Sequence, residues 1–284
     1  MPHPAGNALR WDERVERARA LSAIRPAAAE ALTFYAAVAE YQKSLLCDGR
    51  LPDANPPRLT IDALELGAVL DAIPGFLARL TRLAPARLAE SAVGLRTFER
   101  EQWRHLIHSR LADEGRDFAE ADHAAMFVVE AVLQPFVEQA ALAEPAESAT
   151  QPRDLPQADG RGPIRCPFCN ALPVVGVLRE EGHGAKRTLV CSLCLIERPY
   201  LRVVCPSCGE QQFDALPVYT ADQFEYIRHI RIEACDRCRS YLKTIDLTKD
   251  GLAIPIVDDI ASVSLDLWAR DRGYVRLRAN LLGL

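Results

Sequence analysis

The chain has 284 residues, 49% of them hydrophobic and 26% charged, a composition typical of a soluble globular protein with one large domain or two ordinary ones. The formal net charge is −5: residues 164–284 hold 16 basic and 15 acidic residues, and the remainder holds 18 and 24. This balance argues against a general nucleic-acid binder. No apolar run approaches the roughly 20 residues of a membrane span, and the start lacks the apolar core of a secretory signal, so we expect a cytoplasmic protein.

The N-terminal half is rich in Ala and Leu and poor in Gly, and its apolar residues recur at helical spacing. This pattern predicts an all-helical domain, residues 1–143, of about five to seven helices. Thr60 is a candidate N-cap, Pro74-Gly75 would break or kink one helix, and Pro135 would kink the last. The helices are expected over 11–24, 27–47, 61–72 with a continuation to 83, 87–112 and 117–143.

Residues 144–163 are rich in Pro, Ala, Ser and charged residues, which predicts a linker. Beyond it, short runs of alternating apolar and polar residues indicate strands and hairpins. The strands are expected over 172–178, 185–190, 199–204, 213–220, 225–234 and 240–247, followed by a helix over 257–272. A Cys-x-x-Cys pair, a hairpin and a second such pair occur twice in succession. We therefore expect two metal modules, residues 164–200 and 201–284.

Eight of the nine cysteines form four Cys-x-x-Cys pairs. Two facing pairs supply four thiolates in a tetrahedron, which suits zinc or iron, whereas disulfides are disfavoured in a reducing cytosol. Each hairpin would join the two pairs that flank it, which gives two sequential sites. A cross-braced arrangement, first pair with third and second with fourth, remains open. The candidate metal ligands are Cys166, Cys169, Cys191, Cys194, Cys205, Cys208, Cys235 and Cys238.

Two complete four-cysteine shells leave no open coordination position, which disfavours hydrolysis at the metal, and we expect a protein that is not an enzyme. One role for the metal is structural, because a bound ion supplies folding free energy to a small module. Iron in the same shell would instead be redox-active. Ligand chemistry alone favours zinc. Four pairs outside a βαβ context disfavour thioredoxin-like dithiol chemistry.

The surroundings of the cysteines go beyond a generic zinc ribbon. They include "CPFCNALPVVGVL", "RTLVCSLCLIERPYLRVVCPSCG", "IRIEACDRCRSYLKTID" and "VDDIASVSLDLWARDRGYVRLRANLL", which cover nearly all of residues 164–284. These segments resemble the FdhE family of formate dehydrogenase accessory proteins, and "ERARALSAI" and "LTFYAAVAEYQ" resemble it more loosely. Asn170 follows the first pair where the family often has Gly, and Asn also adopts the left-handed turn conformation.

The resemblance implies a cytoplasmic assembly or maturation factor that is needed for active formate dehydrogenase but is not one of its subunits. It implies contact with the catalytic subunit, which carries molybdenum and an Fe–S cluster. It also implies rubredoxin-like iron binding by the cysteines, so that two iron ions are favoured over two zinc ions on family grounds. The expected fold is α+β and multidomain: a helical N-terminal domain, two sequential rubredoxin-like or zinc-ribbon-like modules with four cysteines each, and a C-terminal helix.

Four residues near the metal modules are candidates for binding the partner. Tyr241 and Lys243 alternate on the strand after the fourth pair, and Asp258 and Asp259 open the last predicted helix. A packed Tyr, a solvated Lys and a helix-capping acid pair are the alternatives. We expect the other possible ligands to be structural or solvated: Cys47, His105, His108, His123, His183 and His229.

Two other functions compete with the assembly factor. A nucleic-acid-binding zinc ribbon would present a basic strand face, and the near-neutral metal region argues against it. A rubredoxin-like electron-transfer protein would need iron in the four-cysteine shells.

Overall fold

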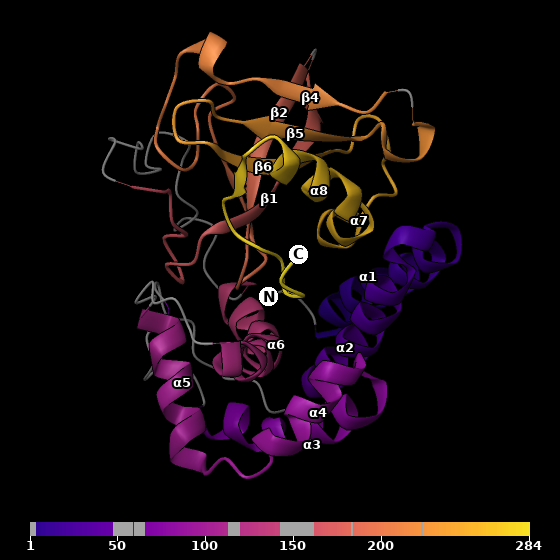
Figure 1. Cartoon of the computed structure of the whole chain (residues 1–284), viewed down its shortest axis with the longest axis vertical. Coiled ribbons are helices and arrows are strands. Elements are labelled where there is room, and N and C mark those ends of the chain that lie inside the picture. Colours follow the sequence, from indigo (N-terminus) through magenta and orange to yellow (C-terminus); the bar gives the residue numbers. More distant parts are fainter. Residues whose placement is uncertain are drawn as a thin grey trace.

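A computed structural model gives the structure of residues 4–47, 59, 66–112, 120–142, 162–182, 184–222 and 224–284. Within these ranges the chain forms a helical region followed by a sheet with two short helices (Figure 1). The helices of the first region are α1 (Pro4–Ile24), α2 (Ala29–Cys47), α3 (Leu66–Leu83), α4 (Ala86–Leu95), α5 (Arg100–Ala112) and α6 (Glu120–Leu142). The helical N-terminal region that the sequence predicts is therefore confirmed.

The helix α6 is the centre of this region. It contacts α2, α3, α4 and α5, and its apolar residues belong to the largest hydrophobic core. Among the described helices, its segment His123–Leu142 alone is long and apolar enough to cross a membrane, which the sequence analysis did not anticipate. Because 78% of that segment is buried inside the protein, we interpret it as the core helix of a folded domain.

The helix boundaries differ from the sequence prediction in three places. α1 begins at Pro4, seven residues before the predicted start at 11. α3 continues through Pro74, while the predicted start at 61 and the Thr60 cap lie outside the described residues. The predicted helix 87–112 is divided into α4 and α5. Two local contacts cause the break: the hydroxyl of Thr97 donates to the Gly94 carbonyl, and the side chain of Gln102 accepts from Glu99 N–H (2.7 Å). These polar groups satisfy the ends of the two helices.

The strands of both metal modules form a single sheet. The order is β3-β2-β1-β6-β5-β4, and β7 pairs with β6. The two antiparallel hairpins, β1–β2 and β5–β6, meet where β1 and β6 run parallel. The bounds are β1 (Pro173–Glu181), β2 (Gly184–Cys191), β3 (Glu197–Pro199), β4 (Val218–Thr220), β5 (Ile230–Ala234), β6 (Ser240–Asp246) and β7 (Val275–Arg276).

Four sequence predictions in this region are wrong in detail. The segments predicted as strands over 213–220 and 225–234 each begin with a short 3-10 helix, Phe213–Ala215 and Glu225–Ile227, so that only β4 and β5 at their ends lie in the sheet. The strand predicted over 199–204 ends at Pro199, because the next residues leave the sheet edge and pack Tyr200 and Val204 on the sheet face. The helix predicted over 257–272 is two helices, α7 (Pro255–Ala261) and α8 (Val263–Asp271), which meet at the buried Ser262. The Ser262 hydroxyl donates to the Asp259 carbonyl (2.9 Å), which closes the first helix.

The helical region and the sheet region are joined by α7 and the C-terminal residues. α7 contacts α1 and α2 on one side and β1 and β6 on the other. Leu281 and Leu282 pack against the helical cores, and the C-terminal end lies between the two regions (Figure 1). The Arg278 guanidinium also pairs with Glu130 of α6. The two regions therefore share a packed and ion-paired boundary.

Candidate metal centres

Each Cys-x-x-Cys pair forms the same tight turn. Four residues after its first cysteine, the backbone enters the left-handed region, at Asn170, Leu195, Gly209 and Arg239. In the first turn, Asn170 N–H donates to the Cys166 carbonyl (2.8 Å), and the equivalent bonds close the second and third turns. A left-handed residue reverses the chain directly after the second cysteine, so both sulfur atoms remain on one side. Asn170 accordingly has φ 61°, as the sequence analysis allowed.

The structure brings the first pair to the second and the third to the fourth. In the first site, Sγ distances are 3.7 Å for Cys166–Cys194 and 3.3 Å for Cys169–Cys191. In the second, they are 3.8 Å for Cys205–Cys238 and 3.7 Å for Cys208–Cys235. The sequential arrangement is therefore the observed one.

The separation of the sulfur atoms fits metal coordination. A tetrahedral ion with metal–sulfur bonds of about 2.3 Å requires sulfur atoms about 3.8 Å apart. Within each site, all four Sγ atoms lie within 4.8 Å of one another. A disulfide needs a separation of about 2.05 Å, and all eight cysteines are free thiols. Each site could hold one metal ion, which gives two per chain.

The first site belongs to the core of the helical region. All four of its cysteines are buried, and they share one hydrophobic cluster with α2, α3 and α6. Phe168 and Leu193, one inside each Cys-x-x-Cys turn, are 1% exposed in that cluster. Gln134 of α6 donates to the Ser192 carbonyl (3.1 Å). Metal at this site would thus hold two turns against the helices.

The second site is nearer the surface. Cys208 and Cys238 are half-buried, whereas Cys205 and Cys235 are buried. Burial raises the pKa of Cys238, but hydrogen bonds that include those from Ser240 outweigh this effect and lower the pKa to about 6. Ser207 N–H lies 3.4 Å from the Cys205 sulfur. The hydrogen bonds at Cys238 favour its thiolate, the form that binds metal.

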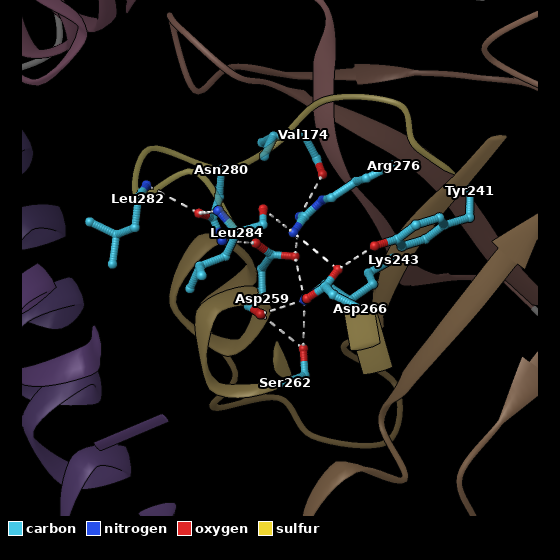
Figure 2. Close-up of polar contacts among 10 residues, drawn as sticks. All are labelled: Val174, Tyr241, Lys243, Asp259, Ser262, Asp266, Arg276, Asn280, Leu282 and Leu284. Carbon is cyan, nitrogen blue, oxygen red and sulfur yellow. Dashed lines mark hydrogen bonds and ion pairs between the residues drawn. The ribbon is translucent and has the colours of Figure 1, made fainter. Parts of the chain in front are cut away.

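Three of the candidate partner-binding residues lie in a buried polar network (Figure 2). Lys243 is 0% exposed and donates to Asp266 (2.6 Å), the Asp259 carbonyl (2.6 Å) and the Ser262 hydroxyl. The Tyr241 hydroxyl donates to Asp266 (2.8 Å). Burial would raise the pKa of Asp259, but Lys243 and Arg276 lower it below its usual value. In this structure these side chains orient α7 and α8 and do not form a surface.

The fourth candidate, Asp258 of α7, is 1% exposed and joins α7 to α1 and to the residue before β5. It accepts from Arg17 of α1 (2.6 Å) and from Ile254 N–H (2.8 Å), and it lies 3.0 Å from His229 Nε2. The contact with Ile254 N–H lies at the start of α7, as expected of an acidic residue there. His229, Asp250 and Asp258 are close enough to hold a cation, but the Arg17 guanidinium already pairs with both carboxylates.

Sequence reasoning missed several members of these networks, namely Arg17, Asp266, Arg276 and Asn280. Asp259 and Asp266 are seven residues apart, a spacing of two helical turns that places both on one side of the segment. The other three residues come from distant segments and leave no local signal. His105 and His123 are exposed on their helices, and His108 is half-buried. His183 lies outside the described residues, as does the side-chain environment of Cys47.

Comparisons with known proteins match the same region. The FdhE central domain family matches residues 165–202, and the FdhE C-terminal domain family matches residues 203–282. A protein FdhE homolog from Aquifex aeolicus is 43% identical over 120 residues, 42% of this chain and 41% of that protein. A homolog from Stutzerimonas stutzeri is 39% identical over 121 residues, 41% of this chain and 37% of that protein. The matched segment thus spans about two fifths of these relatives.

A solved structure extends the similarity to the whole fold. The crystal structure of the FdhE protein from Pseudomonas aeruginosa matches with a TM-score of 0.76 and 26% identity. The match covers 96% of this chain and 95% of that one, so it includes the helical region.

Proposed function

Because residues 165–282 match the FdhE central and C-terminal domain families, we propose that this chain belongs to the FdhE family and is an accessory protein for the assembly or maturation of formate dehydrogenase. It acts in the cytoplasm, binds the catalytic subunit of that enzyme and is not a subunit of the finished enzyme. The observation that carries the proposal is the presence of two four-cysteine centres inside these two family domains. The similarity of the whole fold to an FdhE crystal structure supports it.

The proposal includes two bound metal ions, one held by Cys166, Cys169, Cys191 and Cys194 and the other by Cys205, Cys208, Cys235 and Cys238. The all-thiolate ligands suit iron or zinc. Family resemblance favours iron, and zinc is the alternative. In either case the ions would supply folding free energy to the sheet region. We also propose the domain limits 1–143, 144–163, 164–200 and 201–284.

Tyr241, Lys243, Asp258 and Asp259 take part in partner binding only indirectly in this proposal. They are buried, so their contribution is to hold α7 and α8 in position beside the sheet. Exposed residues of the same elements would then make the contacts with the client enzyme.

Gene deletion tests the function. Cells that lack this protein should lose formate dehydrogenase activity while they still produce the catalytic subunit, and the wild-type gene should restore activity. A variant with Cys169 and Cys208 both changed to Ser should not restore it. Normal activity in the deletion strain, under conditions where the enzyme is required, would refute the proposal.

Electron transfer is a second candidate function for the second site. Cys208 and Cys238 are half-buried, and a redox centre near the surface is accessible to another protein. Anaerobically purified protein should then contain iron and show visible absorbance that reduction bleaches. Stoichiometric zinc with no iron and no visible absorbance would rule this function out.

A further inference from the structure

A pocket of about 80 Å³ lies beside the second four-cysteine site. Cys205 and Cys235 form part of its wall, and Val203, Phe213 and Val218 form its apolar side. A water molecule needs about 10–15 Å³ by this kind of measure, so the pocket has room for several waters or for one side chain. None of the contacts described above fills it.

The pocket lies on the face of the sheet that α7 and α8 leave open. Val218 pairs with Glu233, and Glu233 pairs with Leu242, so these three residues share one face. The alternate residues face the helices: Tyr219 packs on Trp268 of α8 (centroids 4.8 Å apart), and Lys243 bonds Asp266 of α8. The sheet is thus covered by helices on one face and has a pocket on the other.

Apolar side chains gather at this pocket. Phe213 is 77% exposed, Val218 51% and Val203 45%. They are three of the twelve large apolar residues that are exposed among the described residues, and all three line the pocket. A contiguous exposed apolar patch is typical of a protein-binding surface.

The strand β4 forms the adjoining edge of the sheet (Figure 1). It lies at the end of the strand order and pairs only with β5 among the described strands. Its outer N–H and C=O groups can pair with an extended segment of another chain, which would pass directly over Val218. An extended partner could place a side chain in the pocket at the same time.

The charges at the pocket select for a carboxylate. Arg187 and Arg231 both pair with Glu233, so this carboxylate neutralises part of their positive charge. Arg202 is exposed, and its only hydrogen-bond partner among the described residues is the Ala185 carbonyl (3.2 Å). An acidic side chain next to the apolar anchor would pair with Arg202. A second copy of this chain would bring another Arg202 to the same face, which disfavours self-association there.

We propose that this pocket and the β4 edge bind an extended segment of the client polypeptide, with an apolar side chain in the pocket and an adjacent carboxylate on Arg202. The inference rests on the proposed function and adds to it the place and the chemistry of recognition.

Binding measurements with the purified formate dehydrogenase catalytic subunit test this inference. We compare the metal-loaded full chain with Val218→Asp and with Arg202→Glu by biolayer interferometry. Val93→Asp and Arg87→Glu, both exposed on α4, are matched controls. We expect the two pocket variants to weaken binding at least tenfold and the two controls to change it less than twofold. Metal content and circular dichroism of each variant verify folding.

A photo-crosslinker then identifies the segment. p-Benzoylphenylalanine at position 213 should crosslink to a stretch of the catalytic subunit that holds an apolar residue within two positions of an Asp or Glu. Exchange of that acid for Lys should restore binding to Arg202→Glu.

The outcomes separate this inference from the proposed function. Unchanged affinity of both pocket variants, with tight wild-type binding, overturns the docking site and leaves the accessory function intact. A wild-type dimer in light scattering that Val218→Asp dissociates assigns the face to a second copy and also overturns the inference. No wild-type binding at all overturns the accessory function and this inference together.

Discussion

The ammonium group of Lys243 lies inside the protein, between the sheet and α8. Lys243 is on β6, the strand that follows the fourth cysteine pair. The structure buries it completely, with bonds to Asp266, to Ser262 and to the Asp259 carbonyl. A buried ammonium group is tolerated only where carboxylates and other acceptors surround it.

The first prediction concerns this buried charge. Among the described residues, Lys243→Met leaves Arg276 as the one cation paired with Asp259 and Asp266, so we expect a loss of about 3–5 kcal/mol in the free energy of unfolding. Lys249→Met is the matched control, since the Lys249–Asp222 pair is exposed and its loss should cost less than about 1 kcal/mol. Urea unfolding followed by circular dichroism measures both. Equal effects of the two substitutions would contradict this assignment.

The second prediction concerns pH. The pKa values of Asp258, Asp259, Glu130 and Glu233 are lowered in the folded protein: although burial alone would raise them, Arg, Lys or His partners and hydrogen bonds outweigh it. In the unfolded chain, carboxyl groups have pKa values of about 4. The stabilising contribution of these four carboxylates is therefore complete above about pH 5. It is lost as the pH falls through the lower folded values.

Urea midpoints between pH 7 and pH 3, with metal content measured at each pH, test this dependence. The urea midpoint should decrease as the pH is lowered below about 5. Asp259→Asn should reduce the pH dependence, and Asp71→Asn, at an exposed site, should not. A wild-type urea midpoint that increases as the pH is lowered from 5 to 3 would contradict the predicted direction of the pH dependence.

At the scale of elements, the parallel pairing of β1 with β6 joins the two metal modules, and it contains one especially close contact. Gly176 of β1 faces Thr244 of β6 in the parallel pair. A Cβ atom at position 176 would overlap the Thr244 hydroxyl, whereas Gly184 of β2 has open space. The side chain of Thr244 therefore occupies the space beside position 176, which only a residue without a side chain leaves free.

The third prediction follows from this contact. Gly176→Ala should lower the free energy of unfolding by about 1–3 kcal/mol, as expected for overpacking, and Gly184→Ala should change it by less than about 1 kcal/mol. Gly176→Ala with Thr244→Ala should recover part of the loss, because the overlapping hydroxyl is removed. Thermal and urea unfolding measure these three variants and Thr244→Ala alone. If the double variant is as unstable as the sum of the single variants, the clash is not the cause.

Some elements could be predicted from the sequence because their signals are local. The helical spacing of apolar residues predicts α1, α2 and α6, and the alternation of apolar and polar residues predicts the hairpins. The four Cys-x-x-Cys pairs predict both sites. The breaks at Thr97 and Ser262 depend on individual hydrogen bonds that periodicity does not register. The early end of β3 depends on tertiary packing of Tyr200 over the sheet. The parallel β1–β6 contact joins residues about 70 positions apart and has no sequence signature.

At the scale of the whole molecule, the two four-cysteine sites differ in what surrounds them. The first is inside the hydrophobic core that includes α2, α3 and α6, and the second is beside an open pocket on the sheet. The sequence predicts both ligand sets but does not indicate which site lies deeper in the protein, because the depth of each site depends on how the sheet packs on the helices. The first site therefore connects the two regions.

The fourth prediction compares the two sites. Cys169→Ser and Cys208→Ser should each lower the metal content from two ions to one. Cys169→Ser should lower the melting temperature by about 10 °C or more, since core packing is lost as well, and Cys208→Ser should lower it by less than half as much. Differential scanning fluorimetry and elemental analysis of the same samples measure these effects. Equal destabilisation by both variants would show that the first site has no special part in joining the regions.

We propose that this chain is a metal-bearing member of the FdhE family and binds formate dehydrogenase while that enzyme is being assembled. Affinity capture of this chain from native cytosol under anaerobic conditions, with elemental analysis of the same sample, tests it most directly. We predict recovery of the formate dehydrogenase catalytic subunit together with two metal ions per chain, and loss of both the subunit and the ions from a chain with Cys169 and Cys208 changed to Ser. Recovery of the metal-loaded chain with no more catalytic subunit than an untagged control would contradict the proposed binding of formate dehydrogenase.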